Sequence, residues 1–140
     1  MRRSTEFEAG ARTPVPVLKE VSPVKDEHEF LAAADIPWTP AEGSPGVSER
    51  VLSADPAADG AELTRLARWE PGLDTSAAGV IRHAYYEEVY LLEGELEDLT
   101  LGKTFASGHF ASRPPGMPHG PYRTGPGCLM LEIRYRPRPS

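Results

Sequence analysis

The chain has 140 residues, which suits a single domain with a sizeable buried core. It carries 15 lysines and arginines against 21 aspartates and glutamates, and the formal net charge of −6 disfavours nucleic acid and anionic membranes as partners. Cys128 is the only cysteine, which excludes an intrachain disulfide. Its place in an apolar run predicts that it packs as a small hydrophobic residue.

The first residues of the chain contain arginines but no apolar stretch of the kind found in signal peptides. No apolar run in the sequence approaches the roughly 20 residues needed to cross a bilayer. We therefore expect a cytoplasmic protein without a membrane partner.

Residues 1–45 differ in texture from the rest and are predicted to form an N-terminal extension or arm. Proline interrupts the β-branched residues of 11–24, which is compatible with an edge strand or an arm but not with a central strand. A swapped arm covering a sheet edge in a homodimer would bury the apolar side chains of this stretch, and a partly ordered tail is the alternative. Those side chains are Val15, Val17, Leu18 and Val21. Residues 25–36 could form a short helical segment that Pro37 would end.

From Gly46 the sequence is typical of an all-β domain, with short strands separated by turns. Within the strand expected at 61–70, Leu63, Leu66 and Trp69 are the candidate core residues. This density of strands predicts a jelly-roll β-barrel over 46–136, followed by a disordered tail at 137–140. The other strands are expected within 47–53, 80–83, 87–94, 95–102, 103–113, 119–123 and 127–136.

Two stretches place histidines, a carboxylate and turn residues at fixed spacing. In the first, 81–94, His83 is followed by Glu87 and then by Gly94. The second, 108–119, reads G-x5-P-x-G-x2-H and ends at His119. Glycine and proline turn the chain sharply, and imidazole and carboxylate ligands on adjacent strands can converge on one metal ion inside a barrel.

This pair resembles the two signature motifs of the cupins, H-x-H-x3,4-E-x6-G and G-x5-P-x-G-x2-H-x3-N. It is most similar to the ChrR-type cupins, the sensor half of certain zinc anti-sigma factors and many stand-alone proteins. Their run of two acids, a strand and EGEL matches EEVYLLEGELED, and their RNPPGSPH run matches RPPGMPH. The resemblance covers roughly the last two thirds of the chain. The sequence differs from these motifs at three positions. Ile81 replaces the first histidine, Thr75 replaces the leading glycine, and Arg123 replaces the terminal asparagine.

The resemblance implies a cupin jelly roll in which His83, Glu87 and His119 hold one divalent metal. Residues two apart on a strand face the same way, so Ile81 and His83 are both expected to point into the barrel, with a turn before Glu87. Two imidazoles and one carboxylate suit non-haem Fe(II), although Zn, Mn or Ni could use the same ligands. The alternative is a hydrogen-bonded polar cluster left from a lost metal site, in which burying the carboxylate without a cation would be costly.

Tyr86 and Arg113 are the candidate catalytic residues beside the metal. Tyr85 or Tyr86 could close the side vacated by the first ligand or donate a hydrogen bond to a substrate oxygen, with packing at the rim as the alternative. Arg113 could pair with a carboxylate of the substrate or with an acid of the protein at the barrel mouth.

The remaining polar residues near the motifs are expected to face solvent. Glu88 should point outward by alternation unless a bulge shifts the register, and His109 should be a solvent-facing histidine unless it serves as a fourth ligand. The acids of 93–98 alternate with apolar residues and predict a solvated face at a hairpin turn rather than a second metal site. They are Glu93, Glu95, Glu97 and Asp98.

A stand-alone cupin of this size is expected to be a small-molecule metalloenzyme. With Fe(II), it would be a dioxygenase-like oxidoreductase that acts on a dicarbonyl, hydroxyketone or phenolic substrate chelated through two oxygens. With Zn, Mn or Ni, the same site would act as a Lewis acid in an isomerase, cyclase or decarboxylase. A ligand- or metal-sensing module is the non-enzymatic alternative, although the leading segment has no cysteine and only His28 where anti-sigma factors carry their zinc domain.

Overall fold

The computed structural model describes residues 24–139, so the predictions made for the arm residues at 15–21 lie outside the described part. Within it the chain is all-β, with short 3-10 turns η3 (Ala33–Asp35), η4 (Pro56–Ala58) and η5 (Ser76–Ala78). Among the described residues no helix has the length and apolarity to cross a membrane. The strands are β2 (Thr39–Pro40), β3 (Val47–Ala54), β4 (Leu63–Trp69), β5 (Tyr86–Asp98), β6 (Lys103–Ala106), β7 (Phe110–Arg113), β8 (Tyr122–Arg123) and β9 (Cys128–Tyr135).

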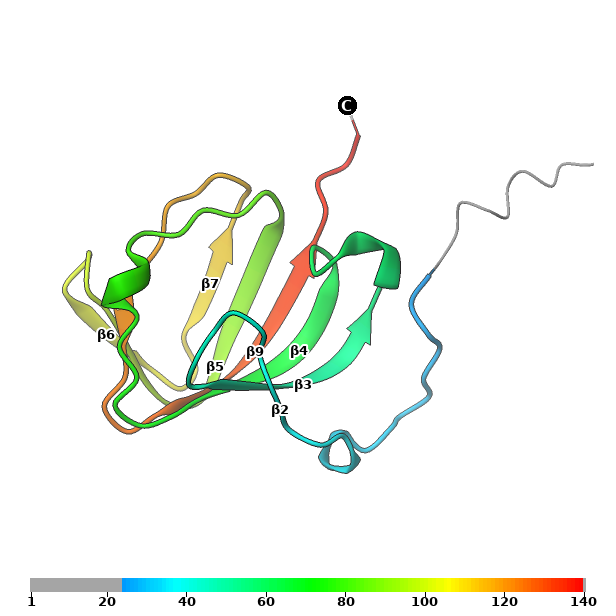
Figure 1. Cartoon of the computed structure of the whole chain (residues 1–140), viewed down its shortest axis with the longest axis horizontal. Helices are drawn as coiled ribbons and strands as arrows, with labels where there is room; N and C mark the ends of the chain where they lie inside the picture. The colour runs from blue at the N-terminus through cyan, green and yellow to red at the C-terminus, as the bar shows by residue number, and fades with distance from the viewer. Residues whose placement is uncertain (1–23, 140) are drawn as a thin grey trace, which may run out of the picture.

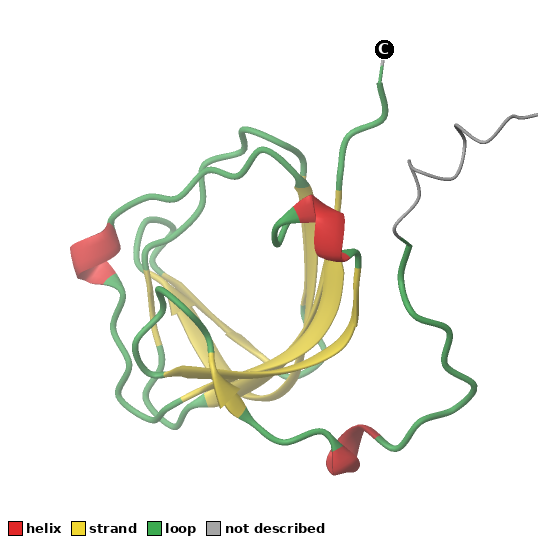
Figure 2. Cartoon of the chain, turned by 45° about the vertical axis from the view of Figure 1, so that its right-hand side comes forward, coloured by secondary structure: helices red, strands yellow, loops and turns green. Residues whose placement is uncertain are grey.

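The long strand β5 joins two antiparallel sheets (Figure 1). Its first part lies between β9 and β7, and this sheet continues from β9 through β4 and β3 to β2. Its last part pairs with β6 on one side and β8 on the other. The sheets curve around a common interior (Figure 2), which is the jelly-roll barrel that the spacing of strands and turns predicted.

Alternation along β5 determines which side chains enter the interior. Glu87, Val89 and Leu91 are buried, as residues two apart on one face of a strand should be. The register shifts between Leu91 and Glu93, and beyond this bulge the buried positions are even-numbered. The main core cluster consists of Val89, Leu91, Leu96, Tyr122, Cys128 and Met130, so Cys128 packs in the core as predicted.

Gly94 occupies the point where β5 passes from one sheet to the other. It pairs with Cys128 of β9, while the next residue already pairs with β6. Its φ is +82°, and a Cβ placed on it would come within 2.0 Å of the backbone oxygen of Gly127. Only glycine allows the two backbones to approach this closely in this conformation.

Several predicted strands differ from the observed ones. Residues 80–83 contribute only an isolated bridge at Ile81. The expected strand 103–113 is divided into β6 and β7, with Gly108 at φ +92° between them, while the strands expected at 87–94 and 95–102 form one continuous β5 to Asp98. The hairpin turn predicted at 93–98 is absent from β5, where Gly94 instead marks a close approach of two backbones.

Two predictions of burial are wrong. Leu66 lies on the opposite face of β4 from the buried Leu63 and Ala67, so it is outside the barrel and not in its core. Asp98 is 7% exposed rather than solvated, and its Oδ1 accepts hydrogen bonds from the backbone N–H groups of Thr100 and Leu101. The bulge in β5 explains this second error, because it brings the even-numbered residues inward.

The sheet begins before the boundary predicted at residue 46. Strand β2 pairs with β3, and Ala41 is buried in a second core cluster with Val47 and Ala67. The helical segment expected at 25–36 is reduced to the single turn η3.

Arg136, just after β9, connects the end of the chain to the β3–β4 connection. It forms ion pairs at 2.9 Å with Asp55 and 3.0 Å with Glu62.

We predict that Gly94→Ala lowers the free energy of unfolding by about 2 kcal/mol or more, because the new Cβ would collide with the backbone at Gly127. Gly102→Ala is the matched control, since Gly102 also has a positive φ (+67°) but has no atom within 4 Å of the added Cβ. It should lose only about 1 kcal/mol. Urea denaturation measures both, and equal losses would contradict the packing argument.

Candidate metal centre

The Glu87 carboxylate lies between two arginines inside the barrel. Glu87 lies on β5, directly opposite Arg113 of the neighbouring strand β7 and opposite Arg134 of β9 on the other side. The strand register therefore places the three residues side by side across the sheet. Arg113 Nη1 donates to Oε1 at 2.9 Å, and Arg134 Nε donates to Oε2 at 3.2 Å. Glu87 is 4% exposed, and a buried carboxylate of this kind requires such partners.

The two histidines are held by loops that are tied to each other through their backbones. Ile81 and His119 form a bridge in which each N–H donates to the other's carbonyl, at 2.8 and 2.9 Å. His83, two residues after Ile81, continues this connection, because its carbonyl accepts a hydrogen bond from the Gly116 N–H at 2.8 Å. Ile81, which stands at the first-histidine position of the motif that the sequence resembles, therefore contributes backbone hydrogen bonds that place His119 beside His83.

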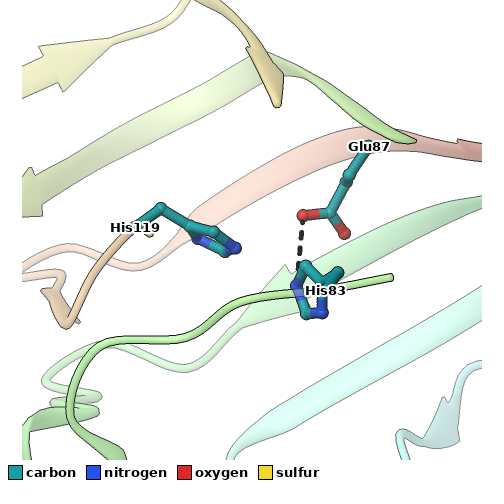
Figure 3. A group of neighbouring side chains, drawn as sticks. All are labelled: His83, Glu87 and His119. Carbon is teal, nitrogen blue, oxygen red and sulfur yellow. Dashed lines mark ion pairs between the residues drawn. The ribbon is translucent and has the colours of Figure 1, made fainter. Parts of the chain in front are cut away.

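His83, Glu87 and His119 converge, with one potential ligand atom of each within 4.8 Å of the others (Figure 3). The two imidazole centroids are 4.9 Å apart, and His83 Nε2 lies 3.6 Å from Glu87 Oε1. His119 Nε2 is the one buried side-chain nitrogen or oxygen that lacks a hydrogen-bond partner among the described residues. A buried polar atom without a partner is destabilising, and an ion at this point would satisfy it.

Tyr122 links His119 to Arg113. The Tyr122 hydroxyl lies 3.0 Å from His119 Nδ1 and accepts a hydrogen bond from Arg113 Nη2 at 2.8 Å. When Nδ1 carries the proton and donates a hydrogen bond to the Tyr122 hydroxyl, Nε2 keeps its lone pair and can bind a metal. Hydrogen bonds of this kind orient histidine ligands in metal sites.

Tyr85 supports the other histidine. The Tyr85 ring stacks on the His83 ring, with centroids 4.6 Å apart and planes at 12° to each other. The Arg134 guanidinium also contacts Tyr85, at 5.1 Å from the ring centroid. The bend at residues 84 and 85, which the sequence predicted, brings Tyr85 to this position before β5 begins. Tyr85 thus restricts the orientation of the His83 ring.

The electrostatic surroundings keep all three residues in the protonation state that a metal requires. Burial, followed by the charge of Arg113, lowers the pKa of His119 to about 4, and burial is also the main reason that the pKa of His83 is lowered. Burial alone would raise the pKa of Glu87, but Arg113 and Arg134 outweigh it and hold that pKa below its ordinary value. At neutral pH the site therefore contains two neutral imidazoles and one carboxylate, and these donors fit a divalent metal.

The structure separates the remaining candidate residues into those that reach this site and those that do not. Arg113 reaches it and pairs with an acid of the protein, which was one of the two predicted alternatives. Tyr86 lies on the other face of β5 and stacks on Tyr135, with centroids 5.0 Å apart, so it is Tyr85 that contacts His83. Glu88 accepts a hydrogen bond from the Tyr135 hydroxyl on that outer face. His109 is exposed, with Nδ1 2.9 Å from the Ala106 carbonyl, and is not part of the converging group.

The sequence interpretation missed the charged residues that β9 and β4 contribute to the interior. Arg134 and Glu132 are two apart on β9, and Glu132 accepts from Arg65 Nε at 2.8 Å while Arg65 Nη1 donates to Glu49 at 2.6 Å. Charges at 132 and 134 alternate with apolar residues, and this alternation is the signal that could have placed both side chains on one face of the strand expected at 127–136.

Known proteins resemble this chain in sequence and in fold. A family model described as the ChrR cupin-like domain matches residues 26–134. The sequence matches no curated protein at a significant level.

Three solved structures illustrate the range of similar proteins. The polyketide cyclase RemF from Streptomyces resistomycificus is 24% identical, with a TM-score of 0.57 over 81% of this chain and 83% of the cyclase. An acetylacetone dioxygenase from Acinetobacter johnsonii is 13% identical, with a TM-score of 0.58 over 91% of this chain and 80% of that enzyme. The anti-sigma factor ChrR, in its complex with SigE from Rhodobacter sphaeroides, is 22% identical, with a TM-score of 0.53 over 72% of this chain and 50% of that chain. At these identities the likeness establishes a shared fold.

Tyr85→Ala is predicted to weaken divalent metal binding by about tenfold or more, because the His83 ring loses the side chain that orients it. Tyr86→Ala is the control, since Tyr86 stacks on the outer face of the same strand. Competition between the protein and a chromophoric chelator for Zn(II) or Co(II) measures both affinities. Equal affinities of the two variants would contradict a role for Tyr85 in positioning His83.

The metal-free protein should lose stability as the pH falls from about 6.5 to about 4, and His119 should account for most of the loss in the upper part of this range, where ordinary carboxylates are still ionised. His119 has a lowered pKa in the folded state, so the unfolded chain binds the proton first, and stability present above the unfolded pKa is lost as the pH approaches the folded pKa. Each pKa unit corresponds to about 1.4 kcal/mol. Urea denaturation across this range should show a smaller decline for His119→Gln than for the control His28→Gln. Identical pH profiles would show that His119 is not the group responsible.

Proposed function

Because the chain belongs to the ChrR cupin-like family, we propose that it is a small-molecule metalloenzyme in which His83, Glu87 and His119 hold one divalent metal. Two observations carry this proposal: one potential ligand atom of each residue lies within 4.8 Å of the others, and His119 Nε2 is buried and lacks a partner among the described residues. Two neutral imidazoles and one ionised carboxylate form the ligand set of many non-haem iron enzymes.

We favour a dioxygenase-like oxidoreductase with Fe(II), acting on a dicarbonyl, hydroxyketone or phenolic substrate. When bound, the metal supplies a Lewis acid for a substrate oxygen and, as Fe(II), the redox chemistry of O2. The ligand set and the fold shared with an acetylacetone dioxygenase support this version. Zn, Mn or Ni in the same site would support an isomerase, cyclase or decarboxylase, and the fold shared with a polyketide cyclase is compatible with that chemistry.

The residues of the chain prepare the site for such a substrate. Arg113 and Arg134 keep Glu87 ionised, and Tyr122 holds His119 in one orientation. Arg113 is the arginine placed to attract an anionic substrate oxygen because, unlike Arg134, it lines a cavity beside His119. We assign it the role of orienting the substrate. Tyr86, the other catalytic candidate, keeps only a packing role in this proposal because it lies on the outer face of β5.

A non-enzymatic sensing module is the second candidate, because the matching family model is named after the ChrR cupin-like domain. Such a module would use the same residues to bind a metal or ligand and would pass the change to a protein partner. A homodimer and a cytoplasmic location remain predictions of the sequence.

Elemental analysis of protein purified without chelator should find about one divalent ion per chain, lost in His83→Ala and Glu87→Ala but kept in the control His109→Ala. Oxygen consumption by iron-loaded protein with β-diketones, hydroxyketones and phenols then tests the dioxygenase version. Bound metal without oxygen uptake would favour the Lewis-acid version, and capture of one stoichiometric protein partner would favour the sensor. Metal content unchanged by both ligand substitutions would contradict the site.

A further inference from the structure

A cavity of about 320 Å³ lies against the metal-site residues Arg113, His119 and Tyr122, while His83 and Glu87 are not part of its lining. It is formed mainly by inward-facing residues of β5 and by β7, together with single residues of β6 and β8 and the loops at 100–101 and 117–120. The cavity is within the size range of small-molecule sites. A cavity at the small end of that range suits a ligand of one or two fused rings.

The lining is largely apolar, and most of its polar atoms already have partners. Asp98 accepts from the backbone of the following turn, and Thr100 donates to the Gly120 carbonyl at 2.7 Å. His109 lies at the cavity with Nδ1 beside the Ala106 carbonyl. The apolar lining residues are Val80, Val89, Leu91, Leu96, Leu101, Phe105, Phe110, Ala111, Met117 and Pro118.

Exposed apolar side chains gather at this cavity. Leu101 is 61% exposed, Phe110 60%, Val80 51% and Met117 42%, and all four line it. Such side chains are costly to expose together, and a group of them around a cavity marks a binding site for apolar ligands.

One end of the cavity is polar and carries charged groups of both signs. Arg113 has five N–H donors, of which two have partners within the described part of the chain, Glu87 and the Tyr122 hydroxyl. Arg113 and Arg134 share the single negative charge of Glu87, so their combined charge exceeds that of their partner. Asp98 also lines this cavity, and its negative charge acts on His119 and Tyr122 and balances that excess. Its Oδ1 is already occupied by the backbone N–H groups of Thr100 and Leu101, whereas Arg113 has N–H donors beyond the two that are used. The donors at this end are therefore suited to an anionic oxygen.

We propose that this cavity binds a hydrophobic ring compound that carries one anionic oxygen group, such as an aromatic carboxylate, phenolate or stabilised enolate. The ring system lies among Leu101, Phe110 and Ala111, and the oxygen group faces Arg113 beside His119. As the substrate class of the enzyme, this assignment rests on the proposed function. As a ligand site, it depends on the cavity alone.

The test uses 2-naphthoate as the probe and 2-naphthylmethanol as its neutral analogue, titrated by calorimetry into the full chain with and without bound Zn(II). The wild-type protein should bind the anion at least about tenfold more tightly than the alcohol, since a hydrogen bond to a charged group is worth that factor. Arg113→Gln should abolish this preference in the metal-free protein while retaining binding of the alcohol. Equal affinity of the wild-type protein for both probes would overturn the assignment of the charged end.

Two further variants locate the ring. Ala111→Phe fills the cavity and should weaken 2-naphthoate binding by about tenfold or more, whereas a variant that binds as tightly as wild type would overturn the location. Leu101→Gln should weaken binding about three- to tenfold, and it stays informative if Ala111→Phe does not fold, because Leu101 is exposed. Leu92→Gln is its matched control, an exposed leucine outside the cavity that should bind as wild type. Equal weakening in both leucine variants would show surface adsorption and would overturn the proposal.

Metal content measured on the same samples separates this inference from the proposed function. Protein that binds 2-naphthoate in the cavity but holds no metal supports the ligand site and contradicts the enzyme. Protein that holds metal but does not bind the probe, in either state, contradicts the ligand site and leaves the metal centre standing.

Discussion

The ionised carboxylate of Glu87, held inside the barrel between Arg113 and Arg134, is the interaction on which the rest of the site depends. It requires strands β7, β5 and β9 in one register, since the three residues face one another directly across these strands. A slip of one residue would turn Glu87 to the outer face and leave two buried guanidinium groups without their partner. The arginines also keep Glu87 charged despite its burial, so the same contacts specify the sheet and prepare a metal ligand.

This arrangement has an energetic consequence for metal binding. Both oxygens of Glu87 already accept hydrogen bonds, so a cation held by Glu87 would compete with these arginines and would lie near two positive charges. His119 acts in the opposite direction, because its neutral and unpartnered Nε2 gains a bond when an ion is present. The affinity of the site is the balance of these two effects, and an anionic ligand next to Arg113 would shift that balance toward binding.

The barrel interior is divided into a charged part and an apolar part, with the three converging residues at their boundary. Toward β4 and β3, the interior carries the ion pairs of Arg65 with Glu132 and Glu49. Toward β6 and β7 it carries the apolar cavity. Arg113 belongs to the boundary, because it contacts Glu87 and also lines the cavity. A molecule that enters from the apolar side therefore meets the metal-site residues with its polar end.

The sequence by itself predicted the jelly-roll fold, because turn residues and strand spacing are local properties of the chain. It also pointed to the three converging residues, through the resemblance of their motifs to those of the cupins. It did not determine which tyrosine supports His83, because the bend before β5 selects Tyr85 over Tyr86. Only the tertiary structure decided that Arg134 shares Glu87 and that Asp98 is buried. The register between β5 and β9 and a bulge within β5 decide these contacts, and both depend on how distant strands pair.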